Sequence, residues 1–442
     1  MALFRVARTL YAGSPIESTV SLYPSDRDEV SEGFSVDIAS TAQAVEGLCS
    51  AWRGWTRSLE TDIDYYLHIL KSDSTVLRPH VTVVYKDGIA QAMLVGLVRR
   101  RRASTIVSFV RLRGPHATVL EIVNGGSIGQ RSPTIDRLMA LELLKTLQGG
   151  QVDLVSFRRL PLHSELFHQL QRLPGLLVRT RISHVLHYTV LSQAASEGSP
   201  TAVSSGKSKR GLRRKARLLQ RAFPGSVRLE CYARPGDLDV GIRDAFAVAA
   251  TTWQSYLGCC GLSDSPEAHE DFEFLAGKGW LRIYVLYVEN IPRAFLTGLL
   301  HNQIFYCQHA GYDPNLARFS VGSLLTGSVV ENLAAVGVQQ VDLGEGGQEH
   351  NRRLGCKLQH EGTVHVYSPT WRGFSLNIFF ASTQIVRAAG RKAREGLRLA
   401  WASRIWKELL MADWRRQNLH QNPLLQATPT RTKQNDNEYY TS

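Results

Sequence analysis

Two distant stretches of the chain share one pattern of apolar and polar positions. The pattern, Tyr-x-x-x-Ile-x-x-Ala-x-Leu-x-Gly-Leu, occupies residues 85–97 and recurs at residues 287–299. Each copy follows a short apolar run and contains a polar pair, Asp87-Gly88 or Glu289-Asn290, where the chain can turn. Apolar runs that flank a short polar turn are typical of a β-hairpin. The sequence therefore predicts two related hairpins.

The elements that follow each hairpin also match. Gln151-Val152-Asp153-Leu154 recurs as Gln340-Val341-Asp342-Leu343, and the helix predicted before each strand has a Glu and a Leu at matching positions. Hairpin, helix and strand thus occur twice in the same order, at a spacing far longer than that of solenoid repeats. This order predicts a duplicated domain of the α/β (α+β) class, in which helices flank mixed sheets.

Other segments complete this outline. Apolar residues recur at helical spacing in 41–70, 132–147, 207–221, 238–256 and 320–337, and two basic amphipathic helices are predicted between 376 and 414. Outside the hairpins, strands are predicted at 103–112, 119–123, 152–157, 183–191, 227–232, 304–310, 338–343 and 363–367. Residues 193–206 form a predicted linker, and residues 1–34 and 418–442 are a predicted flexible lead-in and disordered tail.

Positive charge is concentrated in two segments. The net charge is +13, and Lys207–Arg221 holds eight basic residues without an acid, while Arg387–Arg416 holds nine basic and three acidic residues. This distribution indicates two basic surfaces rather than a generally cationic protein. The six cysteines include no C-x-x-C pair, which argues against a zinc site or a disulfide framework and fits a reducing compartment. No run of 18 apolar residues predicts a membrane span, so we predict a cytoplasmic protein, with peripheral membrane attachment as an option.

The second half of the sequence resembles a known family. The features that carry the resemblance follow one another in order: the basic Arg-Leu helix, Trp253, Trp280-Leu281-Arg282, Gly311-Tyr312-Asp313-Pro314, Ser320-Val321-Gly322-Ser323-Leu324-Leu325 and Asp342-Leu343-x-x-Gly346. They look like the acetyltransferase family associated with bacterial cellulose biosynthesis (CelD-type), within the GNAT superfamily and related to the FemAB transferases. The resemblance is strongest over residues 207–367. The sequence departs from the family at His350-Asn351 and Leu354, where the family usually has Tyr-Lys and Trp.

The resemblance, which covers roughly residues 40–370, implies two tandem GNAT-like domains, residues 35–192 and 207–370. The pattern of the sequence itself predicts basic amphipathic helices over residues 371–417. It also implies acyl-CoA as the donor substrate, an acceptor with an amine or hydroxyl group, and no metal. The second domain is expected to be catalytic and the first supportive, because Gly322 has no glycine counterpart at Arg131-Ser132-Pro133. Partners in polysaccharide or cell-envelope biosynthesis are expected on the same basis.

A donor-binding loop is predicted between the strand that ends near Ala310 and the helix that follows. Backbone N–H groups at a helix N-terminus attract phosphates, a glycine permits close approach of the ligand, and an arginine adds positive charge. The predicted donor-binding residues are therefore Arg318, Ser320, Val321, Gly322 and Ser323. An ordinary helix start capped by serine is the alternative interpretation.

Transfer to an amine or hydroxyl also needs a group that removes a proton. The predicted catalytic residues are His309, Tyr312, Asp342 and Glu345. His309 precedes the donor loop, and an imidazole base suits neutral pH, although a histidine bonded within the sheet is the alternative. Asp342 matches Asp153 of the first repeat and can equally be structural. Glu345 matches Ser156 instead, which makes it the better candidate for the base.

The basic helix has two different faces. Leu212, Ala216, Leu219 and Phe223 lie on one face at helical spacing, and the other face consists of arginines and lysines. Because eight cations without acids repel one another, we predict that Arg210, Arg213, Arg214 and Arg217 bind an anion. The anion would be a donor phosphate, an anionic polymer or a membrane surface, and a solvated helix face is the alternative.

Taken together, these features predict an acyl-CoA-dependent N- or O-acyltransferase in which the acceptor attacks the thioester directly. One alternative is a FemAB-like transferase with an aminoacyl-tRNA donor, in which the basic helix would contact RNA phosphates. Another is a non-catalytic scaffold of an exopolysaccharide system. The sequence contains no P-loop, nucleophile elbow, zincin or dinucleotide-binding motif.

Overall fold

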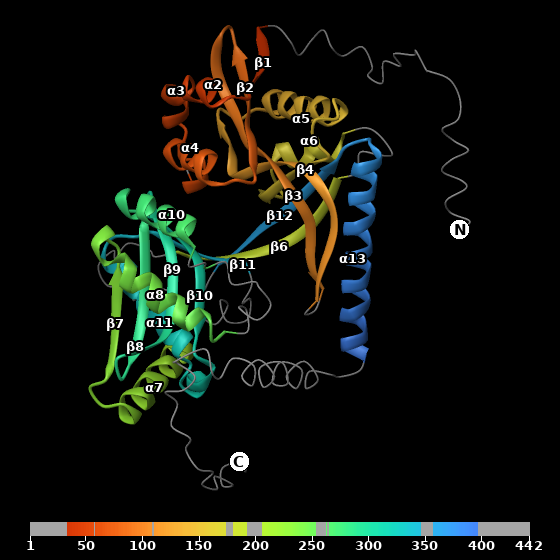
Figure 1. Ribbon diagram of the computed structural model, residues 1–442. Coiled ribbons are helices and arrows are strands. Elements are labelled where there is room, and N and C mark those ends of the chain that lie inside the picture. Colours follow the sequence, from red (N-terminus) through yellow and green to blue (C-terminus); the bar gives the residue numbers. More distant parts are fainter. Residues whose placement is uncertain are drawn as a thin grey trace.

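The computed structural model describes residues 33–56, 58–107, 110–173, 180–191, 206–252, 262, 265–345 and 357–396. In this part of the chain, twelve strands form one sheet in the order β1-β2-β3-β4-β5-β12-β6-β11-β10-β9-β8-β7 (Figure 1). We call β1–β5 with β12 the N-terminal half and β6–β11 the C-terminal half. The predicted lead-in, linker and tail lie outside the described residues, apart from residues 33, 34 and 206. The helical segment after residue 396, Trp253, His350, Asn351 and Leu354 also lie outside them.

The N-terminal segment begins with a strand that the sequence did not predict, β1 (Phe34–Ala39). The elements after it are α2 (Ala42–Glu46), α3 (Cys49–Arg53), η1 (Leu59–Thr61), α4 (Ile63–Ser72), β2 (Val76–Lys86), β3 (Ile89–Val107), β4 (Val110–Gly129), α5 (Pro133–Gln148), β5 (Leu154–Pro161), α6 (Glu165–Gln171) and β6 (Thr180–Leu191). The single helix predicted over residues 41–70 is wrong. Glycines end α2 and α3, and Asp62 caps α4 with its side chain, so the segment forms separate short helices.

The second segment repeats this order. Its elements are α7 (Gly206–Ala222), β7 (Val227–Tyr232), η2 (Pro235–Asp237), α8 (Leu238–Ala249), α10 (Pro266–Gly277), β8 (Leu281–Val288), β9 (Ile291–His301), β10 (Ile304–Tyr312), η3 (Pro314–Phe319), α11 (Val321–Ala335), β11 (Gln340–Glu345), β12 (Lys357–Tyr367) and α13 (Trp371–Gly396). Helices α7 and α11 pack on one face of its sheet and α8 and α10 on the other.

The two predicted hairpins are confirmed in detail. β2 pairs with β3 and β8 pairs with β9, both antiparallel, and each pair has a register shift at the same point of the repeat. The shift lies between Val84 and Tyr85 in the first hairpin and between Leu286 and Tyr287 in the second. A shared irregularity at a matching position supports duplication more strongly than shared strands do, because bulges are specific local features.

The halves exchange one strand each. β6 follows the N-terminal elements but pairs with β11, whereas β12 follows the C-terminal elements but pairs with β5. β6 and β12 also pair with each other, antiparallel, through ten residue pairs. Each half thus takes its sixth strand from the other segment, and the two sheets join into one. The boundaries predicted from the sequence do not include this exchange.

The single strand predicted at 103–112 is wrong, because it covers the end of β3, up to Val107, and the start of β4, from Val110, which pair antiparallel. The strand predicted at 119–123 lies within β4. Residues 99–107 of β3 and 110–119 of β4 form a two-stranded extension, here called the arm, along which α13 lies (Figure 1). Leu376 of α13 is fully buried, and Phe379 would contact any side chain added at Gly114 of the arm. Trp371, Phe374, Ile378 and Ile385 form an exposed apolar stripe on α13. No helix among the described residues is long and apolar enough to cross a membrane.

Polar contacts also hold the two halves against each other. His68 Nε2 lies 2.7 Å from Asp271 Oδ1, and Lys278 Nζ lies 2.7 Å from Asp64 Oδ2. Leu59 of η1 is buried in the core formed by α8 and α10 of the opposite half. The first segment therefore supplies part of the surroundings of the second half's sheet.

Candidate functional site

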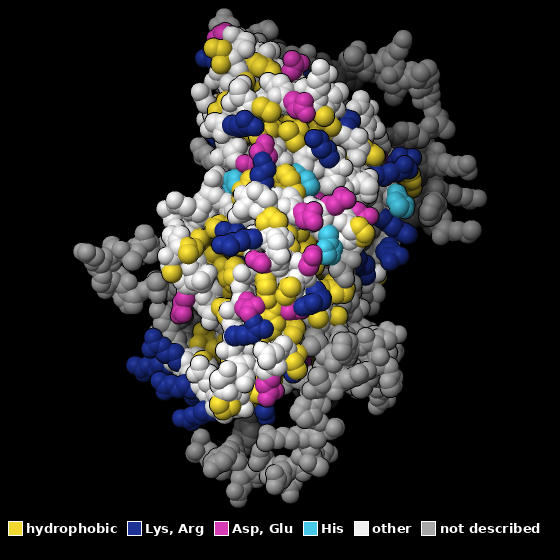
Figure 2. All heavy atoms as spheres, turned by 60° about the vertical axis from the view of Figure 1, so that its left-hand side comes forward, with side chains coloured by type: hydrophobic (Ala, Val, Ile, Leu, Met, Phe, Trp, Pro, Cys, Tyr) yellow, Lys and Arg dark blue, Asp and Glu magenta, His cyan; other side chains and the backbone are white. Residues whose placement is uncertain are grey.

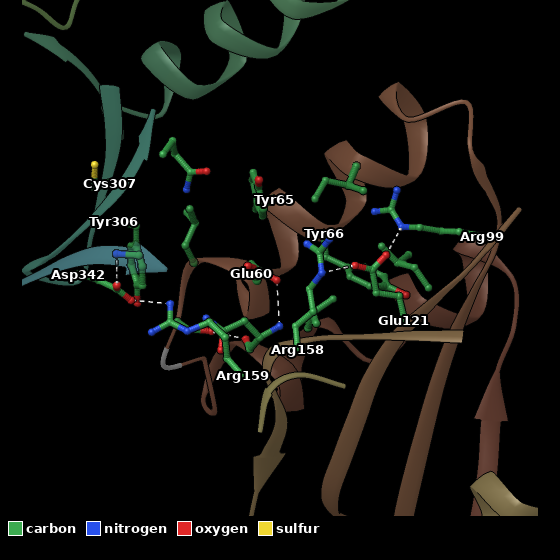
Figure 3. A pocket seen from close by; sticks show the side chains of 18 of the residues that line it. Glu60, Tyr65, Tyr66, Arg99, Glu121, Arg158, Arg159, Tyr306, Cys307 and Asp342 are labelled. Carbon is green, nitrogen blue, oxygen red and sulfur yellow. Dashed lines mark hydrogen bonds and ion pairs between the residues drawn. The ribbon is translucent and has the colours of Figure 1, made fainter. Parts of the chain in front are cut away.

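A cavity of about 340 Å³ lies between the two halves (Figure 3). On one side it is lined by Tyr306, Cys307 and Gln308 of β10 and by Asp342 and Gly344 of β11. On the other side it is lined by residues of η1, α4, β3, β4 and β5, among them Glu60. Side chains from both segments therefore face one enclosed space, here called the inter-half cavity.

The cavity lies where β10 and β11 separate. The two strands pair in parallel only through Ile304–Tyr306 and Gln340–Asp342, although β10 continues to Tyr312 and β11 to Glu345. A register shift in β10 between Cys307 and His309 marks the point of separation. Strands that diverge leave backbone N–H and C=O groups facing the gap, and these can bind a ligand that contains amide groups. This gap opens into the inter-half cavity at Cys307 and Gly344.

His309 lies just beyond the separation. Its cross-strand partner is Thr297 of β9, so it shares a sheet face with Phe295 and Leu299, which belong to the core beneath α8 and α10. Tyr306, which lines the inter-half cavity, packs against the same core. Burial lowers the pKa of His309 below its usual 6.5, because the protonated ring loses solvation. The imidazole is therefore neutral at pH 7 and able to accept a proton.

The N-terminus of α11 differs from that of α5, its counterpart in the first repeat. Ser132 caps α5 by accepting from the N–H of Ile135, Pro133 occupies the first turn, and Asp136 places a carboxylate there. Ser320 adopts a left-handed conformation with φ of +56°, makes no side-chain cap, and α11 has no acid in its first turn. At the N-terminus of α5, the protein's own serine and carboxylate thus interact with the positive end of the helix dipole. The N-terminus of α11 has no such cap or acid, so an external anion can bind there.

The predicted donor-binding residues surround this open end. Arg318 is exposed in η3 and its guanidinium lies over the Phe319 ring, 4.6 Å from its centre. Gly322 lies beside Tyr312, because a Cβ added at Gly322 would be 3.0 Å from Tyr312 Cδ1. The side chain of Val321 is fully buried, so only its backbone can take part in binding. Ser320 and Ser323 are partly exposed in the same turn.

The basic helix α7 packs beside this turn. Leu219 is buried against α11, Phe223 meets Phe319 edge to face, and Lys215 Nζ donates to the carbonyl oxygen of Arg318 at 2.5 Å. The predicted apolar face of α7 is confirmed for these residues. The predicted anion-binding residues are exposed and form no ion pair with a carboxylate of the described residues: Arg210, Arg213, Arg214 and Arg217. Figure 2 shows Lys and Arg side chains gathered at the end of the molecule where α7 lies in Figure 1.

Asp342 lines the inter-half cavity but is committed to an ion pair. Its Oδ2 lies 2.5 Å from Arg159 Nη1, and its Oδ1 accepts the N–H of Gly344 at 2.8 Å. Arg159 also pairs with Glu361 through Nε at 2.8 Å. Asp153, the counterpart of Asp342, accepts a backbone N–H from Thr118. Glu345 ends β11, and its side chain lies outside the described part of the structure.

A group of arginines around Glu121 of β4 was not predicted from the sequence. Arg99 Nε and Arg101 Nη1 lie 3.2 Å and 3.4 Å from Glu121 Oε2, and Arg158 Nε lies 2.7 Å from Oε1 (Figure 3). The available signal was the run Arg99–Arg102, which lies between the first predicted hairpin and the strand predicted at 103–112. In a continuous strand, alternation directs every second side chain to one face.

Residues 206–352 match a family model described as "Acetyltransferase (GNAT) domain". This region has a GNAT-type acyltransferase fold. With the repeat and the paired hairpins, the tandem GNAT-like fold predicted from the sequence is confirmed. The description of the matched model names no narrower family, so the resemblance to the cellulose-biosynthesis family stays a prediction. No curated protein matches the chain in sequence.

Several solved structures are similar over most of the chain. The C-terminal domain of a proposed lysylphosphatidylglycerol synthetase from Agrobacterium fabrum is 12% identical, covers 77% of this chain and 96% of its own, and gives a TM-score of 0.46. A tandem GNAT protein of the clavulanic acid biosynthesis pathway is 10% identical, with coverage of 76% and 99% and a TM-score of 0.42. A GCN5-related N-acetyltransferase from Sphaerobacter thermophilus is 13% identical, with coverage of 77% and 96% and a TM-score of 0.38. These similarities are too distant to assign a substrate.

Proposed function

We propose that the protein is an acyl-CoA-dependent N- or O-acyltransferase whose C-terminal half binds the donor. The observation that carries the proposal is the arrangement of three features along β10. The strand separates from β11 beside the inter-half cavity, passes His309, and leads to the uncapped N-terminus of α11. This order suits a donor with an anionic end and a reactive thioester end joined by a linear arm that contains amides.

In the proposed reaction, the donor's diphosphate lies at the N–H groups of Val321, Gly322 and Ser323, with Arg318 beside it. The acyl thioester lies in the gap between β10 and β11, and the acceptor enters from the inter-half cavity. The acceptor nitrogen or oxygen attacks the thioester carbonyl, the C–S bond breaks, and CoA leaves as the thiolate, which takes a proton from solvent to give the thiol. His309 takes the proton that the acceptor loses, with Tyr312, Asp342 and Glu345 as alternative candidates.

Donor binding provides the first test. The substitution Arg318→Gln is expected to weaken acetyl-CoA binding about tenfold, a loss of about 1.4 kcal/mol, because a charge-assisted contact to phosphate is removed. Arg131→Gln, at the corresponding place before α5, is the matched control and should leave the affinity unchanged. Isothermal titration calorimetry of both variants with acetyl-CoA checks the result. An equal loss in both variants, or no binding of acetyl-CoA by the unmodified protein, would refute the proposed donor site.

The role of His309 predicts a specific pH dependence. Only the neutral imidazole accepts a proton, and its pKa is lowered from 6.5, so kcat/KM should begin to fall only below pH 6.5. His309→Gln should reduce turnover by about 100-fold or more and remove that acidic limb, while acetyl-CoA affinity is unchanged. The release of CoA thiol with amine acceptors, measured from pH 5 to 9, checks both effects. An unaltered pH profile in the variant excludes His309 as the base.

Helix α7 supports one alternative function. Its exposed arginines beside the donor turn also suit the phosphates of an aminoacyl-tRNA, as in a FemAB-like transferase. The melting temperature of the protein, measured with tRNA and with acyl-CoA, distinguishes the two donors. An increase with tRNA and none with acyl-CoA would favour the aminoacyl-tRNA donor. A protein that binds neither would instead be a non-catalytic scaffold of an exopolysaccharide system. Action in polysaccharide or cell-envelope biosynthesis, in the cytoplasm or at the inner face of the membrane, is part of our proposal and rests on the sequence resemblance.

A further inference from the structure

A second hollow of about 620 Å³ adjoins the inter-half cavity. It lies between the arm, β5, β12 and α13, and we call it the arm groove. Its walls include Arg101 and Arg102 of the arm and Phe380 of α13. The two hollows share Glu60, Arg101, Glu121, Asn124, Arg158 and Arg159 as lining residues. A molecule that enters the inter-half cavity can therefore extend into the arm groove.

The ionic groups of the two hollows are unevenly distributed. Where they meet, Arg99, Arg101 and Arg158 all face the single carboxylate of Glu121, and Arg99 has a further partner in Asp73. Arg101 and Arg158 have no carboxylate of their own among the described residues, and their side chains are 40% and 56% exposed. Each guanidinium has five N–H donors, so both retain donors that can reach a ligand.

The local electrostatics favour a further anion at this point. Burial lowers the pKa of Arg101, and the neighbouring charges of Arg99 and Arg158 lower it further, although Glu121 opposes this effect. An anionic group beside Arg101 and Arg158 would offset that repulsion, and planar guanidinium groups bind phosphate and carboxylate through paired hydrogen bonds.

Glu60 provides the opposite charge a short way along the same path. Its Oε2 accepts the backbone N–H of Asn124 at 2.9 Å, and its carboxylate has no cationic partner among the described residues. It lies between the arginines and the β10 side of the cavity in Figure 3. A cationic amine would thus be attracted to the end of the path where Tyr306, Gln308 and the gap between β10 and β11 lie.

We infer that Arg101 and Arg158 form an anion subsite for the acceptor, which is a molecule with a phosphate or carboxylate group at one end and an amine at the other. The inference rests on the proposed acyltransferase function for the role of the amine. The anion subsite itself depends only on the arginines and the groove, so it can be tested separately.

Three small probes test the inference: ethanolamine, O-phosphoethanolamine and β-alanine. All have a primary amine, and only the last two add an anionic group, a phosphate and a carboxylate respectively. Saturation-transfer NMR titrations should show at least tenfold tighter binding of one or both anionic probes than of ethanolamine, and the stronger of the two identifies the anion. The double variant Arg101→Gln/Arg158→Gln should lose this difference, whereas Arg243→Gln, an exposed arginine of α8, should retain it.

The conservative variant Arg158→Lys keeps the positive charge of the side chain. It should therefore retain most of the affinity for the anionic probe that Arg158→Gln loses. If the double variant fails to fold, these two single variants decide, because Arg158 is more than half exposed. Equal binding of all three probes, or unchanged binding of the anionic probes by the Gln variants, would overturn the inference. Acetyl-CoA affinity, measured in parallel, should be unchanged in every variant. If the unmodified protein does not bind acetyl-CoA, the proposed function is refuted, whereas the result for the anion subsite still holds.

Discussion

Replacement of Arg159 by Met is expected to lower the free energy of unfolding by about 3–5 kcal/mol, the largest effect that we predict for a single substitution. Arg159 belongs to β5, and its two carboxylate partners, Asp342 and Glu361, belong to β11 and β12. All three side chains are at least four-fifths buried. Removing the cation deprives two buried carboxylates of the positive charge of Arg159, and the loss of one partner of a buried ion pair costs far more than the net contribution of that pair.

Met is a suitable substitute because it removes the positive charge and keeps a long, unbranched side chain. Arg159 has a φ of +52°, a conformation that is unfavourable for any residue with a Cβ, so Met retains this strain and fills a similar volume. The control is Arg243→Met, which removes a surface pair with Asp244 and should cost less than about 1 kcal/mol. Urea unfolding monitored by circular dichroism measures both variants. If Arg159→Met stays within about 1 kcal/mol of the unmodified protein, the pair does not join the halves as described.

The substitution Gly298→Ala is expected to lower the free energy of unfolding by about 3 kcal/mol. This is near the upper end of the usual cost of adding a methyl group to a well-packed core. A Cβ at this position would lie 2.2 Å from Phe305 Cζ and 2.6 Å from the carbonyl oxygen of Tyr306. The backbone oxygen belongs to the paired strand β10 and cannot move alone. Because Tyr306 lines the inter-half cavity, the strain should also reduce turnover.

Gly96→Ala is the matched control from the first repeat. Its Cβ would meet the terminal methyl groups of Leu120 and Ile122 at 2.8 Å, and the nearest backbone atom, the carbonyl oxygen of Glu121, lies at 3.2 Å. Flexible side-chain ends can shift, so the expected cost is smaller, about 1 kcal/mol. Thermal and urea unfolding of the two variants provide the comparison. A larger effect at Gly96 than at Gly298 would contradict this account of the repeat.

The parts of the candidate site that depend on residues close together in the chain were predictable from the sequence. The start of α11 and its lack of acids follow from residues close together in the chain, and the contrast with Ser132-Pro133 was visible in the sequence. That Ser320 adopts a left-handed conformation and does not cap the helix is seen only in the structure. The pairing of Asp342 was not predictable, because its partner Arg159 lies far away in the chain and meets it only in the folded sheet. For the same reason the sequence did not reveal that Glu60 and Arg158 of the first segment line the cavity at β10.

By itself, the sequence determined that one unit occurs twice, since hairpins and amphipathic helices depend on alternation, turns and spacing over a few residues. It also determined the apolar face of α7 and the position of the turn before α11, where we propose that the donor binds. Only the tertiary structure decided that the two units exchange β6 and β12, because strand pairing between remote segments leaves no local pattern. That exchange brings β5 beside β12 and close to β11, and it is the physical reason why arginines of the first repeat meet the separated strands of the second.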